Sequence, residues 1–488
     1  MFDLNRGFLF LCVLCAARVG FACDRVPAGE PLWIRLSAPI STYTAKAGDS
    51  VHGVLTQDVV CDNDVVLPMG APVDGVVRSK RKVGWGIRHE TAALELVFNR
   101  ATVSPGVAVE MTARVQEVEN AREQVRNGVI QGIRSSDTFQ GRINSRLIHL
   151  PTWNPYSDAF LIAYKATFPI FPEPEIYYPI GTDIRLKTVS DIESPAVASA
   201  SRESALTDKE ESERIEQLVG QLPWRVTTGK HVDADLLNIV FLGSQEEVRS
   251  AFRRAGWNNA DPVSRHTVLK NMYALLNNSG YAQQPMMTFL MDGQPQDMNW
   301  QKNLNSYGRR DHLRIWEWTA NGETDSVWIS SSTHDTEAVL AVKYKGFVHH
   351  IESDIDEERS KVIRDLNFAG CVQSVSFVPR PDMPTSTRNA TGDIMHTDGS
   401  VAVVALKACQ PADPQLDSNS KGGSYKPGNL AFRYIRKQIL TFRNDIWPHT
   451  PTSCSVNRSL CSFGPSLRVL RHGGSAPSSH SRRRYCRL

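Results

Sequence analysis

The side chains best suited to chemistry lie between residues 309 and 350. Three histidines of this stretch, together with a carboxylate, would suit a divalent metal ion, and a metal-bound water could then hydrolyse a phosphoester. These histidines are His312, His334 and His350. No His-x-His or Glu-x-x-His spacing connects them, so the ligands would have to come from separate segments of the chain. We therefore keep a metal-dependent hydrolase as the alternative interpretation.

The same stretch suits the binding of an anion. Alternation along a strand beginning at His312 places Arg314 and Trp316 on the same side as His312. Guanidinium groups on that side would bind a phosphate or a carboxylate through two parallel hydrogen bonds. The binding candidates are Arg309, Arg310, His312, Arg314, Trp316, His334, Asp335, His349 and His350. Polar side chains of this kind also pair with one another to stabilise a fold, and we favour that structural role over ligand binding, and ligand binding over hydrolysis.

The sequence around these residues predicts an α/β domain with a mixed sheet and helices packed on it. The apolar run from 237 to 242 predicts a strand, and Ser244 with Glu247 forms a capping box that begins a helix. A second helix is expected from Pro262, and a third from Asp354, whose capping box would include Glu357. The apolar stripe of the second helix is Val268, Met272, Leu275 and Leu276. Further strands are expected at 287–291, 312–318, 326–331, 338–342, 371–378 and 401–406.

Several short motifs in this order resemble the LssY C-terminal domain family, over residues of about 225–408. The motifs are Asn238-Ile-Val-Phe-Leu-Gly-Ser, Ala251-Phe252 with Ala255-Gly256-Trp257, Pro295-Gln296-Asp297, Arg309 to Trp316, His349 to Asp356 with Glu358-Arg359, and Thr397-Asp398-Gly399. The family is bacterial, occurs alone or beside membrane-embedded domains, and takes its name from a secretion locus. The resemblance therefore implies a role in the cell envelope or in secretion, with envelope or secretion components as partners, and it implies no particular reaction.

Residues 24–192 are rich in strand signals and contain a repeated turn. The motif Pro-x-Gly-x-x, followed by an alternating apolar run, occurs at Pro27, Pro68 and Pro179. A tight turn built from Pro and Gly feeds a strand each time. The strand spacing predicts an all-β sandwich or barrel. In pattern this region resembles the β-domain of TrbI-like secretion channel proteins, which implies a barrel and carries no functional residue.

The first 22 residues have the three parts of a secretory signal. Arg6 precedes the apolar run 8–17, and small residues at 20–22 offer a cleavage site. Cys23 follows directly, so lipidation there is an alternative to plain secretion. An exported chain folds in an oxidising compartment, whether periplasmic, outer-envelope or extracellular, and Cys371 and Cys409 flank two predicted strands. They form a disulfide if these strands are neighbours, and two half-buried thiols otherwise.

The chain as a whole is expected to be multidomain α+β. The expected order is a signal peptide (1–22), a β-rich domain (24–192), a linker with a short helix (193–224), the α/β domain (225–410) and a segment 411–488. That last segment combines a loop, a short basic helix and a disordered Arg-rich tail suited to peripheral contact with anionic lipid. The net charge of +3 gives no reason to expect nucleic acid. We expect an exported envelope protein with a non-catalytic, binding or secretion-associated role, in which a divalent metal is a cofactor only under the hydrolase alternative.

Overall fold

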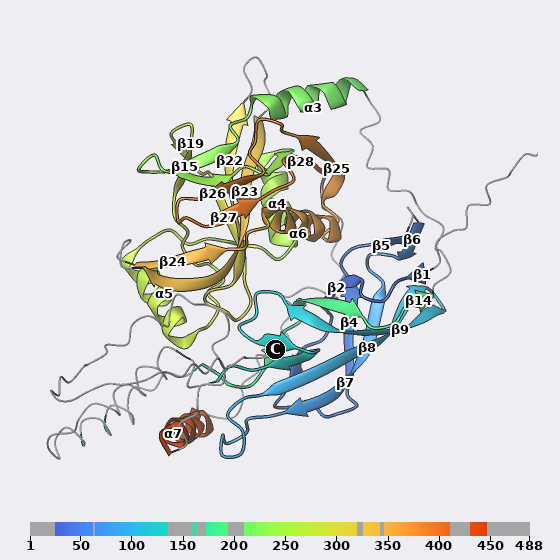
Figure 1. Ribbon diagram of the computed structural model, residues 1–488, viewed down its shortest axis with the longest axis vertical. Coiled ribbons are helices and arrows are strands. Elements are labelled where there is room, and N and C mark those ends of the chain that lie inside the picture. The colour runs from blue at the N-terminus through green and yellow to red at the C-terminus, as the bar shows by residue number, and fades with distance from the viewer. Residues whose placement is uncertain are drawn as a thin grey trace, which may run out of the picture. The chain divides into compact units, whose positions relative to one another are not determined.

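The computed structural model describes residues 25–61, 64–134, 138, 159, 163, 172–193, 209–319, 326–341, 346–409 and 430–446 (Figure 1). Residues 1–445 form one compact unit and 446–488 a second. The predicted signal peptide and Arg-rich tail lie outside the described residues. In the described part of the chain, no helix has both the length and the apolar character needed to cross a membrane.

The described residues between 25 and 193 lie mainly in strands and the turns between them, and we call this part of the chain the β-domain. Its strands are β1 (Arg25–Val26), β2 (Pro31–Leu36), β3 (Ile40–Ser41), β4 (Ser50–Leu55), β5 (Val59–Cys61), β6 (Asp64–Leu67), β7 (Pro72–Arg81), β8 (Ala93–Ser104), β9 (Val107–Val118), β10 (Gln124–Arg126), β11 (Val129–Gln131), β12 (Tyr177–Tyr178), β13 (Asp183–Thr188) and β14 (Ile192–Glu193). Strands β8, β7, β4, β2, β13 and β9 pair in that order, and β8 also pairs with β9. This last pairing closes the sheet into a six-stranded barrel, so of the two predicted architectures the barrel is the one formed.

The repeated Pro-x-Gly motif builds the same turn before three strands of the barrel. Gly29, Gly70 and Gly181 have φ angles of +97°, +84° and +84°, a region that L side chains rarely adopt. In each turn the backbone N–H of the residue after glycine donates to the carbonyl of the proline, as in a type II turn. Strands β2, β7 and β13 begin within two residues of these glycines. The prediction that the motif punctuates the sheet is confirmed.

The second part, residues 209–409, is the α/β domain. Its elements are α3 (Lys209–Gln221), β15 (Arg225–Thr228), β16 (Asp233–Leu236), β17 (Ile239–Leu242), α4 (Gln245–Arg254), β18 (Asn258–Asn259), α5 (Arg265–Asn277), β19 (Phe289–Met291), β20 (Gln294–Pro295), β21 (Met298–Lys302), β22 (Arg310–Thr319), β23 (Ser326–Ala341), β24 (Gly346–Ile351), α6 (Ile355–Phe368), β25 (Val372–Pro379), β26 (Ser386–Arg388), β27 (Ile394–His396) and β28 (Ser400–Leu406). The main sheet runs β18-β21-β22-β23-β17-β28-β25, with β24 paired to β23. Because β17 and β28 are parallel and the other pairs are antiparallel, the sheet is mixed, as predicted.

Alternation along the central strands separates two apolar layers, one on each face of this sheet. On β22, Leu313 and Ile315 pack with α4 and α6, whereas Trp316 packs with α3 on the other face. On β17, Phe241 belongs to the first layer and Val240 to the second. A helix with a wide apolar face covers each layer. The barrel has its own apolar core, which includes residues from β2, β8, β9 and β13.

Four local predictions differ from the structure. The two strands expected at 326–331 and 338–342 are one continuous strand, β23. The second helix begins at Arg265, with Ser264 as its cap, because Pro262 lies before the helix. Its expected core stripe is partly wrong, since Val268 and Met272 are exposed. For the third helix, Asp354 caps α6 by accepting from the N–H of Asp356, without the box expected at Glu357.

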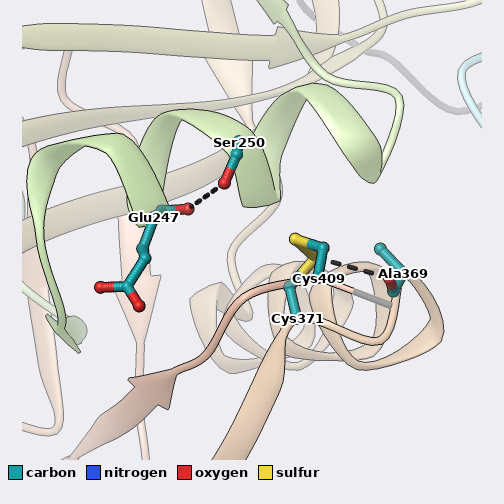
Figure 2. Close-up of a disulfide and its surroundings, with 5 residues drawn as sticks. All are labelled: Glu247, Ser250, Ala369, Cys371 and Cys409. Carbon is teal, nitrogen blue, oxygen red and sulfur yellow. Dashed lines mark hydrogen bonds between the residues drawn. A yellow bond between two sulfur atoms is a disulfide. The ribbon is translucent and has the colours of Figure 1, made fainter. Parts of the chain in front are cut away.

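Cys371 and Cys409 form a disulfide between the segment that enters β25 and the segment that leaves β28. Figure 2 shows it beside the end of α6, where the sulfur of Cys371 lies 3.4 Å from the carbonyl oxygen of Ala369. The two strands are antiparallel neighbours, which was the condition for a bridge. Cys61 is also disulfide-bonded.

The last described element is α7 (Leu430–Ile446), which lies in the segment 411–488 where a short basic helix was expected. Its Leu440 is buried in the apolar core of the barrel. Arg436 forms an ion pair with Glu173 of the β-domain, and its side chain is almost fully buried. Phe432 of the same helix lies against Tyr43 and Trp85, so apolar packing and a buried guanidinium together hold this helix on the barrel.

Candidate functional site

The register of β22 and β23 sorts the candidate residues onto opposite faces of the sheet. His312 lies opposite Thr333, and Asp311 lies opposite His334. Successive side chains of a strand point to opposite faces. His312 and His334 therefore face away from each other across one sheet, although their strands are directly paired.

On one face, Asp335 is the centre of a buried cluster, the Asp335 cluster, formed by Arg310, His312, Asp335 and His349. Arg310 donates from Nε to Oδ2 of Asp335 over 2.7 Å. The Nδ1 atoms of His349 and His312 lie 3.3 and 3.5 Å from the same oxygen. Asp335 is 1% exposed and Arg310 is 5% exposed. A charge pair so well removed from water is costly to break.

Burial decides the protonation of this cluster. It lowers the pKa of His312 to about 3, against the opposing attraction of Asp335. It likewise lowers the pKa of His349 to about 4. Burial alone would raise the pKa of Asp335, but the facing imidazoles and the Arg310 guanidinium hold it well below its ordinary value. At neutral pH the cluster is thus an Arg–Asp ion pair flanked by two neutral imidazoles.

These shifts predict that His312 and His349 stay neutral at pH 5. In NMR spectra of histidine-labelled protein, their ring signals should titrate with midpoints at about 3 and about 4. In urea-unfolded protein every histidine should titrate near 6.5. Because both folded values lie below the unfolded one, unfolding takes up protons between about pH 4 and 6.5, and these two residues weaken the fold as the pH falls through that window. A midpoint near 6.5 for either ring in the folded protein would contradict the burial that we describe.

The other candidates on this face also have structural partners. Arg314 donates to the carbonyl of Met287 over 3.0 Å and pairs with Asp235 at 3.3 Å. Its guanidinium lies 4.1 Å from the ring centroid of Phe289. Trp316 is 1% exposed and donates from Nε1 to the carbonyl of Gln294. A guanidinium bound in this way has few donors left for a ligand.

On the opposite face, three side chains form a second group, the Asp311 cluster, consisting of Asp311, His334 and Glu358. Nδ1 of His334 lies 2.7 Å from Oδ1 of Asp311. One ligand atom from each residue lies within 4.8 Å of the other two. Burial alone would lower the pKa of His334, but its hydrogen bond to Asp311 raises that pKa above the ordinary value. Sequence reasoning missed Asp311 and Glu358, since nothing in their spacing connects a strand residue with the first turn of a distant helix.

The structure does not bring His312, His334 and His350 together. His312 belongs to the Asp335 cluster, His334 to the Asp311 cluster, and Nδ1 of His350 lies 2.6 Å from a carboxylate oxygen of Asp393. Arg309 points to the β-domain, where it pairs with Glu117. Each of the three histidines has its own carboxylate partner, and within the described residues the Asp311 cluster is the one group with metal-ligand spacing.

A buried ion network joins the α/β domain to the β-domain. We call it the Asp183–Asp365 network: Arg35, Asp183, Lys302, Lys361 and Asp365. Its nitrogen–oxygen distances are 2.6 to 3.0 Å. Burial alone would raise the pKa of both aspartates, but the three cations hold them well below the ordinary value. Sequence analysis missed this network because its members are spread over more than 300 residues.

A hollow of about 550 Å³ lies in the α/β domain beside α3 and the start of α4. Leu218, Ser244, Glu317 and Trp328 are among its lining residues. None of the nine predicted binding residues lines it. The polar clusters and this hollow are therefore separate features.

Comparison with known proteins finds a family model that matches part of the chain. Residues 218–401 match the model of the family described as the LssY C-terminus, so the resemblance inferred from the motifs is confirmed for that segment. A solved structure of ComB10 of the Com type IV secretion system of Helicobacter pylori is 13% identical, covers 36% of this chain and 94% of its own, and has a TM-score of 0.22. At this score the similarity carries no argument about fold or function. No curated protein matches the chain.

Proposed function

Residues 218–401 match the model of the LssY C-terminal family, and from this premise we propose that the chain is an exported, non-catalytic binding protein of the bacterial cell envelope. Its partners would be envelope or secretion components. The α/β domain would supply the binding surface, and the β-domain would hold that domain in place through the Asp183–Asp365 network. The basic segment beyond residue 447 would add peripheral contact with anionic lipid.

The observation that carries this proposal is the oxidised state of the cysteines. Cys371 and Cys409 are bridged, and Cys61 is disulfide-bonded as well. Disulfides persist in secreted and periplasmic proteins and are rare in the reducing cytosol. Together with the apolar leader at 8–17, they support export.

The burial of the candidate catalytic groups supports a role without catalysis. His312 and Asp335 are 4% and 1% exposed, and both are committed to the Asp335 cluster. A general base must reach the substrate within hydrogen-bond distance. The hydrolase centred on His312, His334 and His350 has no corresponding support, because the three rings are not neighbours.

Export is tested by comparing the full chain with a variant lacking residues 1–22. In a bacterial host, the full chain should be recovered in the periplasmic fraction. Mass spectrometry of that protein should show cleavage near residue 22 and a disulfide between Cys371 and Cys409. The shortened variant should stay in the cytosol with free thiols. Its free energy of unfolding should be lower by about 2–4 kcal/mol, because the unfolded chain loses a cross-link. A Cys371→Ser/Cys409→Ser variant of the full chain is the control for this one bridge and should show part of that loss, since Cys61 stays disulfide-bonded in it.

Recovery of the full chain in the cytosol, with residues 1–22 attached and its thiols free, would contradict the proposed export. The absence of catalysis is tested separately, with a chromogenic phosphodiester and added Zn²⁺ or Mn²⁺. The rate of hydrolysis with the protein should equal the rate in buffer without it. Turnover that disappears in His312→Ala would instead establish the hydrolase.

A further inference from the structure

We propose that the Asp311 cluster is a binding site for one divalent transition-metal ion, Zn²⁺ or Mn²⁺, with Asp311, His334 and Glu358 as ligands. This inference goes beyond the proposed function, since it requires neither export nor a binding partner. The ion would have a structural role, because it would tie α6 to the central strands of the sheet.

Three different elements deliver the ligands to one place. Asp311 is on β22, His334 lies opposite it on β23, and Glu358 is in the first turn of α6. Their ligand atoms lie within 4.8 Å of one another. Metal–ligand bonds of about 2.0–2.2 Å put two ligands of one ion at most about 4.4 Å apart, so small side-chain rotations complete the site.

The independent observation is an oxygen of Glu358 without a partner. Glu358 is 4% exposed, and its Oε1 atom is buried with no hydrogen-bond donor among the described residues. A buried carboxylate oxygen without a donor is strongly destabilising unless a proton or a cation satisfies it. Its neighbours in the cluster are a carboxylate and an imidazole, the groups that would complete a metal site.

A residue of the β-domain positions one of the ligands. Asn120, 4% exposed, donates from Nδ2 to Oδ2 of Asp311 over 2.8 Å. Because Asn120 binds Oδ2, the other carboxylate oxygen of Asp311, Oδ1, faces His334. Hydrogen bonds of this kind hold metal-binding carboxylates in orientation. Asp311 therefore has, besides its contact with His334, a second partner that fixes its orientation, as metal-binding carboxylates do.

Lys361, whose charge acts on Glu358, already has three carboxylate partners, so it does not fill the site. Lys361 pairs with Glu119, Asp183 and Asp365 at 2.8 to 3.0 Å. Imidazole together with two carboxylates suits Zn²⁺ and Mn²⁺ better than Mg²⁺ or Ca²⁺, which bind through oxygen alone.

The test uses the full chain after removal of metal with a chelator. Elemental analysis after dialysis against Zn²⁺ or Mn²⁺ should find about one ion per chain. The thermal midpoint should rise by about 5 °C or more at a 100-fold excess over Kd. The variant Glu358→Gln should weaken binding by about 100-fold or more, because it removes the ligand charge while keeping the shape.

The matched control is Glu357→Gln, the same substitution one residue earlier, on a side chain that is 51% exposed. It should bind the ion like the original chain. In chelator, Glu358→Gln should unfold cooperatively at a temperature close to that of the metal-free original chain, which shows that the variant folds. The proposal is overturned if neither ion binds in stoichiometric amount, if Glu358→Gln binds unchanged, or if Mg²⁺ and Ca²⁺ produce an equal shift.

Discussion

Replacing Asp365 by asparagine should lower the free energy of unfolding by about 3–5 kcal/mol, the cost of removing one partner from a buried ion pair. Asp365 is 1% exposed and accepts hydrogen bonds from Arg35, Lys302 and Lys361. Its Oδ2 atom also accepts from Nε1 of Trp257. Asparagine keeps the volume but removes the charge and presents N–H groups to these cations. Asp183 would then be the carboxylate left to pair with Arg35 and Lys302, whereas Lys361 would keep both Asp183 and Glu119.

Urea denaturation followed by tryptophan fluorescence measures this loss. Asp74→Asn is the control, because Asp74 forms an exposed pair with His52 and exposed pairs contribute about 0–1 kcal/mol. Because the folded pKa of Asp365 is depressed, its contribution is complete above the unfolded pKa of about 3.9 and disappears as the pH falls toward the folded value. The difference between the original chain and Asp365→Asn should therefore shrink below about pH 4. Equal stabilities at pH 7 would contradict the network.

Replacing Asp335 by asparagine should lower the free energy of unfolding by about 3 kcal/mol. The variant leaves the guanidinium of Arg310, 5% exposed, without its ion pair. It also removes the carboxylate that opposes the pKa depression of His312 and His349. The ring signals of both histidines should therefore titrate at a lower pH than in the original chain.

Denaturation midpoints and the histidine spectra together check this second prediction. The control is Asp233→Asn, since the Asp233 side chain is 65% exposed although it pairs with Arg225. It should change stability by less than about 1 kcal/mol. A variant at Asp335 that keeps full stability would show that Arg310 finds another partner, and the Asp335 cluster would not be a structural unit.

Local chemistry made much of the fold predictable. The Pro-x-Gly turns needed only the steric freedom of glycine, and Ser244 with Glu247 forms the capping box that its spacing predicts. Alternation correctly divided Leu313 and Ile315 from Trp316. Each of these signals acts over a few residues, where the backbone alone sets the geometry.

The polar clusters could not be predicted from the sequence, because they depend on how strands and helices pair with one another. The register of β22 on β23 decides which residues face each other, and a shift by one residue would have put His334 on the face of His312. The partners of Asp365 come from β2, β21 and α6. Contacts between segments so far apart in the chain leave no local pattern in the sequence. The apolar stripe of α5 failed for a related reason, because periodicity shows that a face exists but not what covers it.

Closure of the barrel limits how this protein can join to others. In the described structure, the six strands of the ring each have neighbours on both sides, so a foreign peptide finds no free row of backbone groups to extend there. The main sheet of the α/β domain is open, and its strand order ends at β18 on one side and at β25 on the other, where Phe377 is exposed. Recruitment by β-augmentation would therefore use an edge of this sheet, and the ring would take no part in it.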